Sequence, residues 1–263
     1  WPFATLGWPK ETDDLKTFYP TSILSTARDI NMLWVVRMIF SGYEFMGKKP
    51  FSEVYIHPTV FNIEGKRMSK SLGTGIDPIG LIDKYGADAT RFGLTYINTG
   101  TQDIKFDENA ILAGKKFANK LWNIARFVMM QSENSSRQAR TIYSSSDSEK
   151  LKPEPKTGAD KKILDSLDHL IISFNSDLDE FKFGQAAHDI YDFVWHDFAD
   201  IYIEASKEQM DDNTKAILNY ALINSLILLH PIMPFITEEI WQELHDQNLV
   251  EEKLLITSKW STK

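Results

Sequence analysis

The 263-residue sequence contains no cysteine. This absence excludes disulfide bonds and thiolate metal sites, and it suits a reducing compartment, so we expect a cytoplasmic protein. The six histidines are scattered without an H-E-x-x-H or similar ligand pair, so we expect no structural metal. No run of about 18 apolar residues predicts a membrane span. The opening "WPFATLGWP" carries no signal peptide and resembles a cut inside a longer protein.

The sequence also has fewer basic than acidic residues, 29 Lys and Arg against 37 Asp and Glu, which gives a formal net charge of −8. This balance disfavours a nonspecific coat for nucleic acid. It leaves room for a local basic site, because a short positive stretch can bind phosphates while the remaining surface stays acidic. One such stretch is "EGKRMSKSLGTGIDP", residues 64–78, which concentrates Lys66, Arg67 and Lys70 beside glycines and serines.

The first part of the chain, up to about residue 115, has mixed α and β patterns. The segment 30–38 has helical spacing, and "FSEVYIHPTVF" predicts a strand. After the glycine-rich stretch, "PIGLIDKYG" predicts a helix and "GADATRFGLTYI" a second one.

The remainder is predicted to be helical, with long amphipathic segments that can bury their apolar stripes in a bundle. The last helix follows Pro231 and Pro234, with Thr237 as the expected N-cap. A serine-rich, charged segment at about 132–160 predicts a mobile connection. We therefore predict two domains, residues 1–114 and 115–263.

The basic stretch has the chemistry of a polyphosphate site. Its glycines permit close backbone approach, its cations neutralise phosphate oxygens, and Ser69 and Ser71 supply hydrogen bonds. It follows a predicted strand, where α/β proteins often bind ligands. The glycine spacing differs from G-x-x-x-x-G-K-[ST], so it is no Walker A loop. The alternative is an ordinary solvated turn.

At residues 67–71, "RMSKS" resembles the K-M-S-K-S signature of class I aminoacyl-tRNA synthetases. Further segments resemble the valyl-tRNA synthetases in the same order: "WPFATLGWP", "FYPTSILSTARDI", "MSKSLGTGIDP", "YGADATRFGL", "GTQDIKFDE", "FANKLWNIARF" and "LLHPIMPFITEEIW". The resemblance covers nearly the whole chain except the serine-rich connection. It implies the second half of a Rossmann-type nucleotide-binding domain followed by an anticodon-binding helical bundle.

The resemblance also implies a reaction, in which ATP (with Mg²⁺ as its counter-ion) activates valine to valyl-adenylate, and valine then passes to tRNA(Val). The matching loop residues are Arg67, Met68, Ser69, Lys70 and Ser71. In the family the second lysine grips the ATP phosphates, and Lys70 holds that position. Arg67 replaces the usual first lysine, which keeps the charge and changes its shape.

Three further residues are assigned by the resemblance, and a fourth candidate, His57, is chosen by its place in the sequence. Asp29 matches the carboxylate that contacts the adenosine ribose, while Ile30 and Trp34 match residues that wall the amino-acid pocket. His57 precedes the loop on the predicted strand and is a candidate for facing ATP. A helix-capping aspartate, a core tryptophan and a structural histidine are the alternatives.

In the helical part, one stripe at helical spacing combines cations and an aromatic ring, which is typical equipment for binding a single-stranded RNA loop. The residues are Lys116, Lys120, Asn123 and Phe127, with Arg126 nearby. The alternative is a solvated helix face with Phe127 tucked into the bundle.

Three hypotheses for the whole chain follow. It is part of a valyl-tRNA synthetase, a non-catalytic tRNA-binding module, or part of an isoleucyl- or leucyl-tRNA synthetase. Because no H-x-G-H motif occurs in the chain, the upstream half of the catalytic domain is expected to be missing and the polypeptide alone is expected to be inactive. A monomer is expected.

Overall fold

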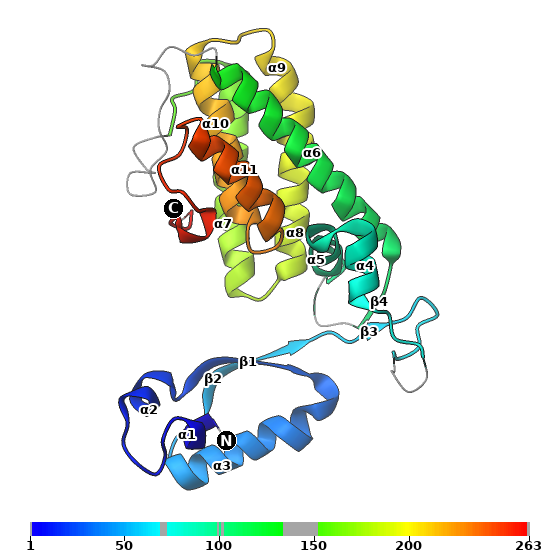
Figure 1. The fold of residues 1–263 in the computed structure, drawn as a ribbon, viewed down its shortest axis with the longest axis vertical. Coiled ribbons are helices and arrows are strands. Elements are labelled where there is room, and N and C mark those ends of the chain that lie inside the picture. Colours follow the sequence, from blue (N-terminus) through cyan, green and yellow to red (C-terminus); the bar gives the residue numbers. More distant parts are fainter. Residues whose placement is uncertain (1, 69–72, 99, 101–102, 134–151, 262–263) are drawn as a thin grey trace. The chain divides into compact units, whose positions relative to one another are not determined.

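The computed structural model describes residues 2–68, 73–98, 100, 103–133 and 152–261 (Figure 1). The chain forms two compact units, the first comprising Trp1–Arg67 with Gly100–Lys105 and the second Met68–Thr99 with Phe106–Lys263. The first unit mixes strands and helices and the second is helical, which confirms the predicted fold class. No helix in the described ranges is long and apolar enough to cross a membrane.

The first unit is built on two pairs of parallel strands. Strands β1 (Thr21–Ala27) and β2 (Phe51–His57) pair from Thr21↔Phe51 to Ala27↔His57. A parallel pair needs a long crossover, which is supplied by η1 (Arg28–Ile30), η2 (Asn31–Val35) and α3 (Val36–Met46). The short strands β3 (Val60–Phe61) and β4 (Ile104–Lys105) form the other pair. Two short helices, α1 (Pro2–Thr5) and α2 (Asp13–Phe18), precede β1.

The core of the first unit is small. Its cluster consists of Phe3, Leu15 and Tyr19, with ring contacts among Phe3, Trp8 and Phe45. Large apolar side chains of the crossover remain exposed instead, including Met32 at 72% and Phe40 at 75%. Parallel sheets are normally covered on both faces, and in this chain the crossover leaves these apolar side chains uncovered.

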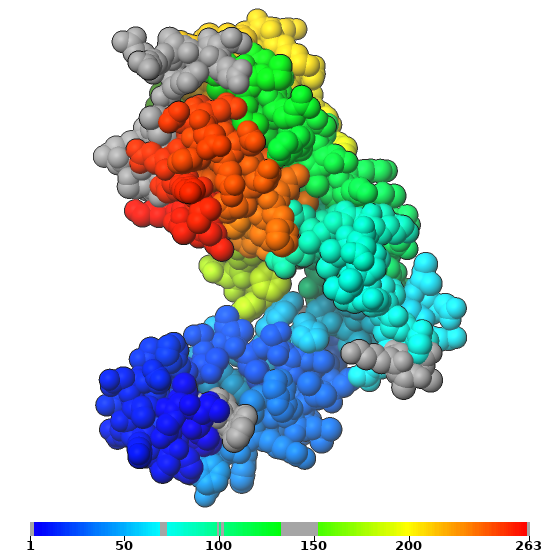
Figure 2. Space-filling model, viewed as in Figure 1, coloured from blue at the N-terminus to red at the C-terminus, as the bar shows by residue number. Residues whose placement is uncertain are grey.

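The second unit contains the helices that follow the basic loop and the bundle. Its elements are α4 (Pro78–Tyr85), α5 (Ala87–Tyr96), α6 (Glu108–Glu133), α7 (Gly158–Asp179), α8 (Phe183–Asp192), η4 (Phe193–Ile203), α9 (Glu204–Ser206), α10 (Asp212–Leu229), α11 (Pro234–Asp246) and η5 (Leu255–Thr257). Helices α6, α7, α8 and α10 pack on one another around a continuous apolar core. In the space-filling view, the orange α11 lies directly against the green α6 (Figure 2).

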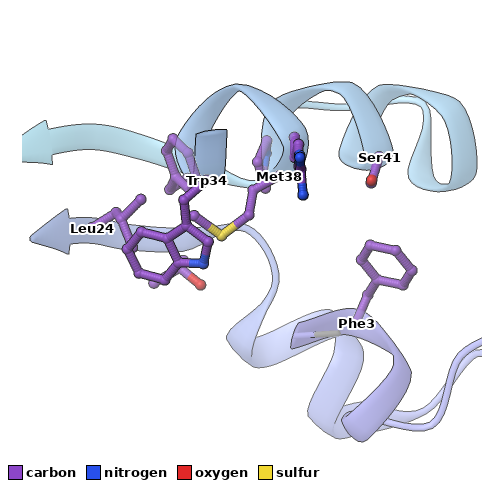
Figure 3. A pocket seen from close by; sticks show the side chains of 9 residues that line it. Phe3, Leu24, Trp34, Met38 and Ser41 are labelled. Atoms are coloured by element: carbon purple, nitrogen blue, oxygen red, sulfur yellow. The ribbon is translucent and has the colours of Figure 1, made fainter. Parts of the chain in front are cut away.

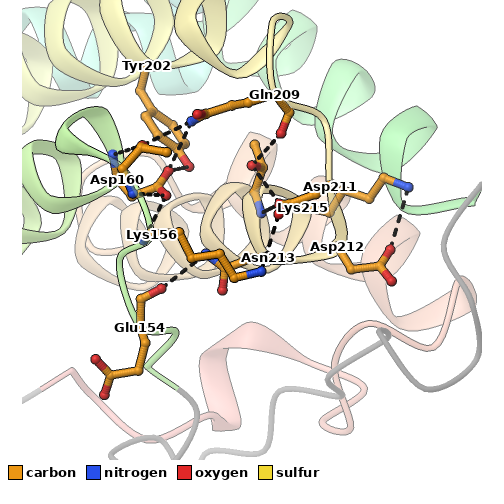
Figure 4. A network of polar contacts seen from close by, with 11 residues as sticks. Glu154, Lys156, Asp160, Tyr202, Gln209, Asp211, Asp212, Asn213 and Lys215 are labelled. Carbon is orange, nitrogen blue, oxygen red and sulfur yellow. Dashed lines mark hydrogen bonds and ion pairs between the residues drawn. The ribbon is translucent and has the colours of Figure 1, made fainter.

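A buried polar network closes one end of the bundle. Thr157 caps α7 and shares a capping box with Asp160, which is 1% exposed. The Asp160 carboxylate also accepts a hydrogen bond from the Tyr202 hydroxyl at 2.8 Å and from the Lys156 amide at 3.1 Å (Figure 4). Burial, followed by the bond to Asp160, raises the pKa of Tyr202 above its ordinary range. These hydrogen bonds to Asp160 hold the start of α7 to the segment that contains Tyr202.

The compact units differ from the predicted domain limits of 1–114 and 115–263. Residue 114 lies inside α6, and the helices α4 and α5 pack in the second unit, although they lie before that limit. The limits remain a prediction about functional domains. The predicted connection at 132–160 is bounded by helix, because α6 runs to Glu133 and α7 begins at Gly158. Residues 134–151 lie outside the described ranges.

The expectation that Thr237 caps the last helix is wrong. Helix α11 begins at Pro234, and Thr237 is fully buried inside its first turn. The Thr237 hydroxyl donates to the Met233 carbonyl at 2.8 Å, as a threonine within a helix does. Met233 at the N-cap position offers no side-chain cap, so the first amides of α11 need another acceptor.

Helices α5 and α6 approach so closely that glycine is required on both. A Cβ atom added to Gly93 would lie 2.7 Å from the Ile111 Cα, and one added to Gly114 would lie 2.7 Å from the Ala89 carbonyl oxygen. These neighbours are backbone atoms, which cannot rotate away. The contact therefore joins the two helices along their backbones.

We predict that Gly93→Ala lowers the free energy of unfolding by about 1–3 kcal/mol, because the added methyl group overpacks this contact. Gly80→Ala in α4 is the matched control. Nothing lies within 4 Å of its added Cβ atom, so it should raise stability by about 0.5–1 kcal/mol. Urea unfolding followed by circular dichroism measures both. Equal effects of the two substitutions would contradict the close contact.

His230, at the end of α10, provides a second prediction. Burial lowers its pKa, against the opposing influence of the Glu238 and Asp88 carboxylates. The neutral ring shares a 2.8 Å hydrogen bond with the Thr237 hydroxyl. Because the folded pKa lies below the unfolded value of about 6.5, the unfolded state binds more protons at mildly acidic pH. Stability from neutral His230 is present above pH ~6.5 and is lost as the pH falls through it.

The expected result is a steeper loss of unfolding free energy between pH 8 and 5.5 in the wild type than in His230→Asn, whose amide can keep the hydrogen bond. Urea titrations of both proteins at each pH measure this difference. Parallel pH profiles would show that His230 is not the titrating group.

Candidate functional site

Two of the predicted nucleotide-binding residues lie at the carboxyl ends of β1 and β2. Register pairs Ala27 with His57, so the two strands end side by side. Asp29 follows in η1, two residues beyond the end of β1. This edge of a parallel sheet is where α/β proteins place their ligands. His57 is exposed there, and its Nδ1 lies 3.1 Å from the Pro58 carbonyl oxygen.

The basic loop reaches the same edge. A turn closed by the Gly65 amide on the Asn62 carbonyl, at 2.8 Å, returns the chain so that Arg67 pairs with Phe61. From that position the Arg67 guanidinium lies 2.8 Å from the Asp29 carboxylate. Both side chains are at least half exposed, so this ion pair contributes little stability and exchanges readily. The structure thus unites the predicted ribose contact with the first residue of the loop signature.

The rest of the loop signature is described only in part. Met68 is half-buried and belongs to the second unit. Ser69, Lys70 and Ser71 lie outside the described residues. The downstream end of the loop enters α4, where the Asp77 carboxylate caps the helix by accepting from the Ile79 amide at 3.0 Å.

Trp34 lines an apolar pocket of about 500 Å³ within the first unit (Figure 3). Its ring points toward Leu24 and Met38, and Arg37 and Ser41 add polar groups to the wall. Ile30 does not line this pocket and is 42% exposed. Trp34 lines this pocket and Ile30, in η1, does not, so the assignment of both to one amino-acid pocket stays a prediction.

Asp103 is a supporting residue that sequence reasoning did not assign. Its carboxylate accepts from the Thr59 amide at 3.1 Å and lies 3.5 Å from the Arg28 guanidinium, next to Asp29. It thereby connects the segment before β4 to both strand ends. Its segment, "GTQDIKFDE", is one that resembles the synthetases, but spacing alone could not reveal a contact across 44 residues.

The predicted RNA-binding stripe lies on α6 in the second unit. Lys116, Asn123 and Arg126 are exposed, while Phe127 is half-buried against the bundle core. Lys120 is engaged within the protein. Its Nζ lies 2.7 Å from the Asp200 carboxylate and 4.8 Å from the centre of the Trp195 ring.

This pairing changes the electrostatics of the stripe. The hydrogen bond from Lys120 is the main cause that lowers the pKa of Asp200, so the carboxylate stays charged and offsets the lysine. The exposed cations Lys116 and Arg126 are left as the main sources of positive potential on the predicted stripe.

Two family matches cover the two ends of the chain, and the first of them includes α4 and α5, which pack in the second unit. The family of class I tRNA synthetases (I, L, M and V) matches residues 1–107. The anticodon-binding domain of tRNA ligases matches residues 160–263. The chain thus combines a class I tRNA synthetase domain with an anticodon-binding domain of tRNA ligases.

Individual relatives agree with this assignment. The chain is 44% identical to the valine–tRNA ligase of Petrotoga mobilis over 99% of its length, and 48% identical to that of Thermotoga maritima over 93%. It spans only 29% and 27% of those proteins. Homologues of this region are thus valine–tRNA ligases, and the chain corresponds to under a third of such an enzyme.

Solved structures share the fold at low sequence identity. The ternary complex of Agrobacterium radiobacter K84 LeuRS with tRNA and LeuAMS matches 97% of this chain and 30% of that chain, with a TM-score of 0.77 and 20% identity. Mycobacterium tuberculosis methionyl-tRNA synthetase in complex with methionyl-adenylate matches 92% and 48%, with a TM-score of 0.72 and 21% identity. These matches confirm the class I synthetase architecture.

Proposed function

We propose that this chain is the part of a valine–tRNA ligase that holds the phosphates and ribose of ATP and binds the anticodon region of tRNA(Val). The observation that carries the proposal is the similarity to valine–tRNA ligases along 93–99% of the chain, across both units. The ion pair between Arg67 and Asp29 supports it, because it brings the signature loop to the proposed ribose contact.

The proposed chemistry is attack of a valine carboxylate oxygen on the α-phosphorus of Mg²⁺-bound ATP. The bond to the β-phosphate bridging oxygen breaks, and pyrophosphate leaves with the electron pair. Negative charge grows on the leaving group, where the Lys70 ammonium would neutralise it. Asp29 would accept hydrogen bonds from the ribose hydroxyls, displacing Arg67 toward the phosphates.

The pocket beside Trp34 is the proposed contribution to the valine site. A rigid indole limits the volume available to a side chain, and the surrounding wall is largely apolar, as a small aliphatic substrate needs. Ile30 would join it only after the η1 segment moves.

Two alternatives retain support. The matching catalytic family includes the isoleucine, leucine and methionine enzymes, so the amino acid is assigned through the valine–tRNA ligase relatives. A non-catalytic tRNA-binding module would use the same bundle without the loop. The retained sequence from Met68 to Ser71 favours an origin in an active enzyme.

We predict that Lys70→Ala in the full-length enzyme lowers the rate of valine-dependent ATP–pyrophosphate exchange about 10²–10³-fold, because one charge is removed from the developing pyrophosphate. Lys16→Ala in α2 is the matched control. Lys16 lies outside the loop, is exposed and is 4.0 Å from Glu11, so its loss should change the rate little. Exchange at the wild-type rate in Lys70→Ala would remove the loop from the mechanism.

The same assay addresses the chain by itself, which is expected to give no exchange because it contains no H-x-G-H motif. A rate near that of the full-length enzyme would contradict this expectation.

For RNA, we predict that the 263-residue chain binds a tRNA(Val) anticodon stem-loop in preference to one with another anticodon. Phe127→Ala should weaken binding about 5- to 100-fold through lost base stacking. Lys116→Ala should weaken it and reduce the slope of log affinity against log salt by about one. Fluorescence titration at two salt concentrations measures both effects.

Lys161→Ala on α7 is the control for the RNA experiment, since this exposed lysine is paired with Asp165 at 2.6 Å. A chain that binds both stem-loops equally, or loses as much affinity with Lys161→Ala, would count against the stripe on α6.

A further inference from the structure

The start of α11 is capped by a side chain from another helix. The Asp88 carboxylate of α5 accepts hydrogen bonds from the Phe235 amide at 3.2 Å and the Ile236 amide at 2.6 Å. Asp88 is only 9% exposed. A carboxylate at a helix N-terminus satisfies free amides and complements the helix dipole. It therefore replaces the cap that Met233 and Thr237 do not supply.

Three residues further along α5, Arg91 contacts backbone carbonyl oxygens in the segment between α10 and α11. Its Nε donates to the Ile232 carbonyl at 3.0 Å, and its guanidinium NH₂ group donates to the Pro231 carbonyl at 2.8 Å. These carbonyls follow the end of α10. The carboxylate holds amides and the guanidinium holds carbonyls, so the pair fixes both the position and the direction of α5 on the α10–α11 turn.

Within the described residues, α5 is connected to the downstream end of the loop through α4. Asp77 caps α4, and Gly86 connects α4 to α5. Helix α4 is also held to the bundle, because Glu108 of α6 accepts from Lys84 at 2.8 Å and from the Tyr85 hydroxyl at 2.7 Å. The downstream end of the loop, described from Gly73 onward, thus belongs to the helical unit, while Arg67 and Asp29 belong to the first unit.

We propose that Asp88 and Arg91 are positioning residues for the adenylation reaction: by fixing α5 on the α10–α11 turn, they set where the downstream end of the ATP-phosphate loop is held. This inference rests on the proposed function of the loop. Neither residue touches substrate. Their substitution loosens α5, and with it α4, whose N-cap Asp77 ends the part of the loop described from Gly73 onward. It leaves the pocket beside Trp34 unaltered, because that pocket is built wholly within the first unit.

The test uses the full-length enzyme with Asp88→Asn and Arg91→Lys, which preserve size or charge and remove part of the hydrogen bonding. Steady-state exchange kinetics are measured against ATP and against valine, normalised by active-site titration. We expect the ATP KM to rise roughly ten-fold and the valine KM to stay within about two-fold. A merely structural role would reduce the amount of active enzyme and leave both KM values unchanged.

Asp160→Asn is the matched control. Asp160 is an equally buried aspartate at the N-terminus of a bundle helix, but it contacts Thr157 and Tyr202 and touches neither α4 nor α5. It should lower the melting temperature as much as Asp88→Asn and leave the ATP KM unchanged. An equal rise in ATP KM for both would overturn the inference, since the effect would then follow stability alone.

The remaining outcomes separate this inference from the proposed function. Wild-type enzyme that shows valine-dependent exchange, together with unchanged ATP KM in Asp88→Asn and Arg91→Lys, overturns the positioning role only. Wild-type enzyme without valine-dependent exchange overturns the proposed function and this inference with it.

Discussion

The carboxylate of Asp88 on the first amides of α11 is the contact on which the organisation of the second unit depends. Helix α11 has no cap of its own, and a buried helix start with unsatisfied amides is costly. Supplying the acceptor from α5 makes the end of the bundle inseparable from the helices that follow the loop. Arg91 and the close approach of Gly93 to α6 reinforce the same attachment from two other directions.

The first unit is organised by a different constraint, the shared edge of two parallel strands. Its own core is small, but the register of β1 and β2 brings Asp29 and His57 to one edge. The loop then returns to this edge through a short turn, so that Arg67 meets Asp29. The replacement of lysine by arginine matters here, because the long side chain of Arg67 places a planar guanidinium against the Asp29 carboxylate while its backbone stays in the loop. The weak, exposed ion pair is compatible with replacement by a nucleotide.

Sequence reasoning predicted the local elements well because helical periodicity and strand patterning are local properties. The strand predicted over 51–61 is observed as two strands, β2 and β3, with a break at residues 58–59, and the helices predicted in "PIGLIDKYG" and "GADATRFGLTYI" are confirmed as α4 and α5. The family, too, was predictable from short segments such as "RMSKS". Long-range polar contacts were not predictable, because a single aspartate or arginine carries no mark of its partner. Asp88 and its amide partners are 147 and 148 residues apart.

The same limit explains the wrong cap prediction for Thr237 and the unforeseen surroundings of some candidate site residues. Thr237 has the composition of a cap, but Pro234 starts the helix three residues earlier and turns the threonine inward. Lys120 has the spacing expected of an RNA contact, and in the structure it forms an ion pair with Asp200, which lies 80 residues away in the sequence. Trp34 lines the apolar pocket of the first unit and Ile30 does not, which the sequence alone did not reveal. The assignments of Lys70 and the other site residues remain predictions, since they depend on chemistry that occurs only with substrate.

The length of α6 gives a mechanical meaning to its two close backbone contacts with α5, Gly93 with Ile111 and Gly114 with Ala89. A helix of 26 residues is about 39 Å long at 1.5 Å per residue. Its first turns are joined to α5 by backbone contact, and its later turns carry Lys116 to Phe127. If α6 tilts as a rigid body by one degree about its start, its far end moves by roughly 0.7 Å. A displacement of this size is enough to break or form a hydrogen bond. Events at either end are therefore linked by rigid geometry, without a chain of intermediate side chains.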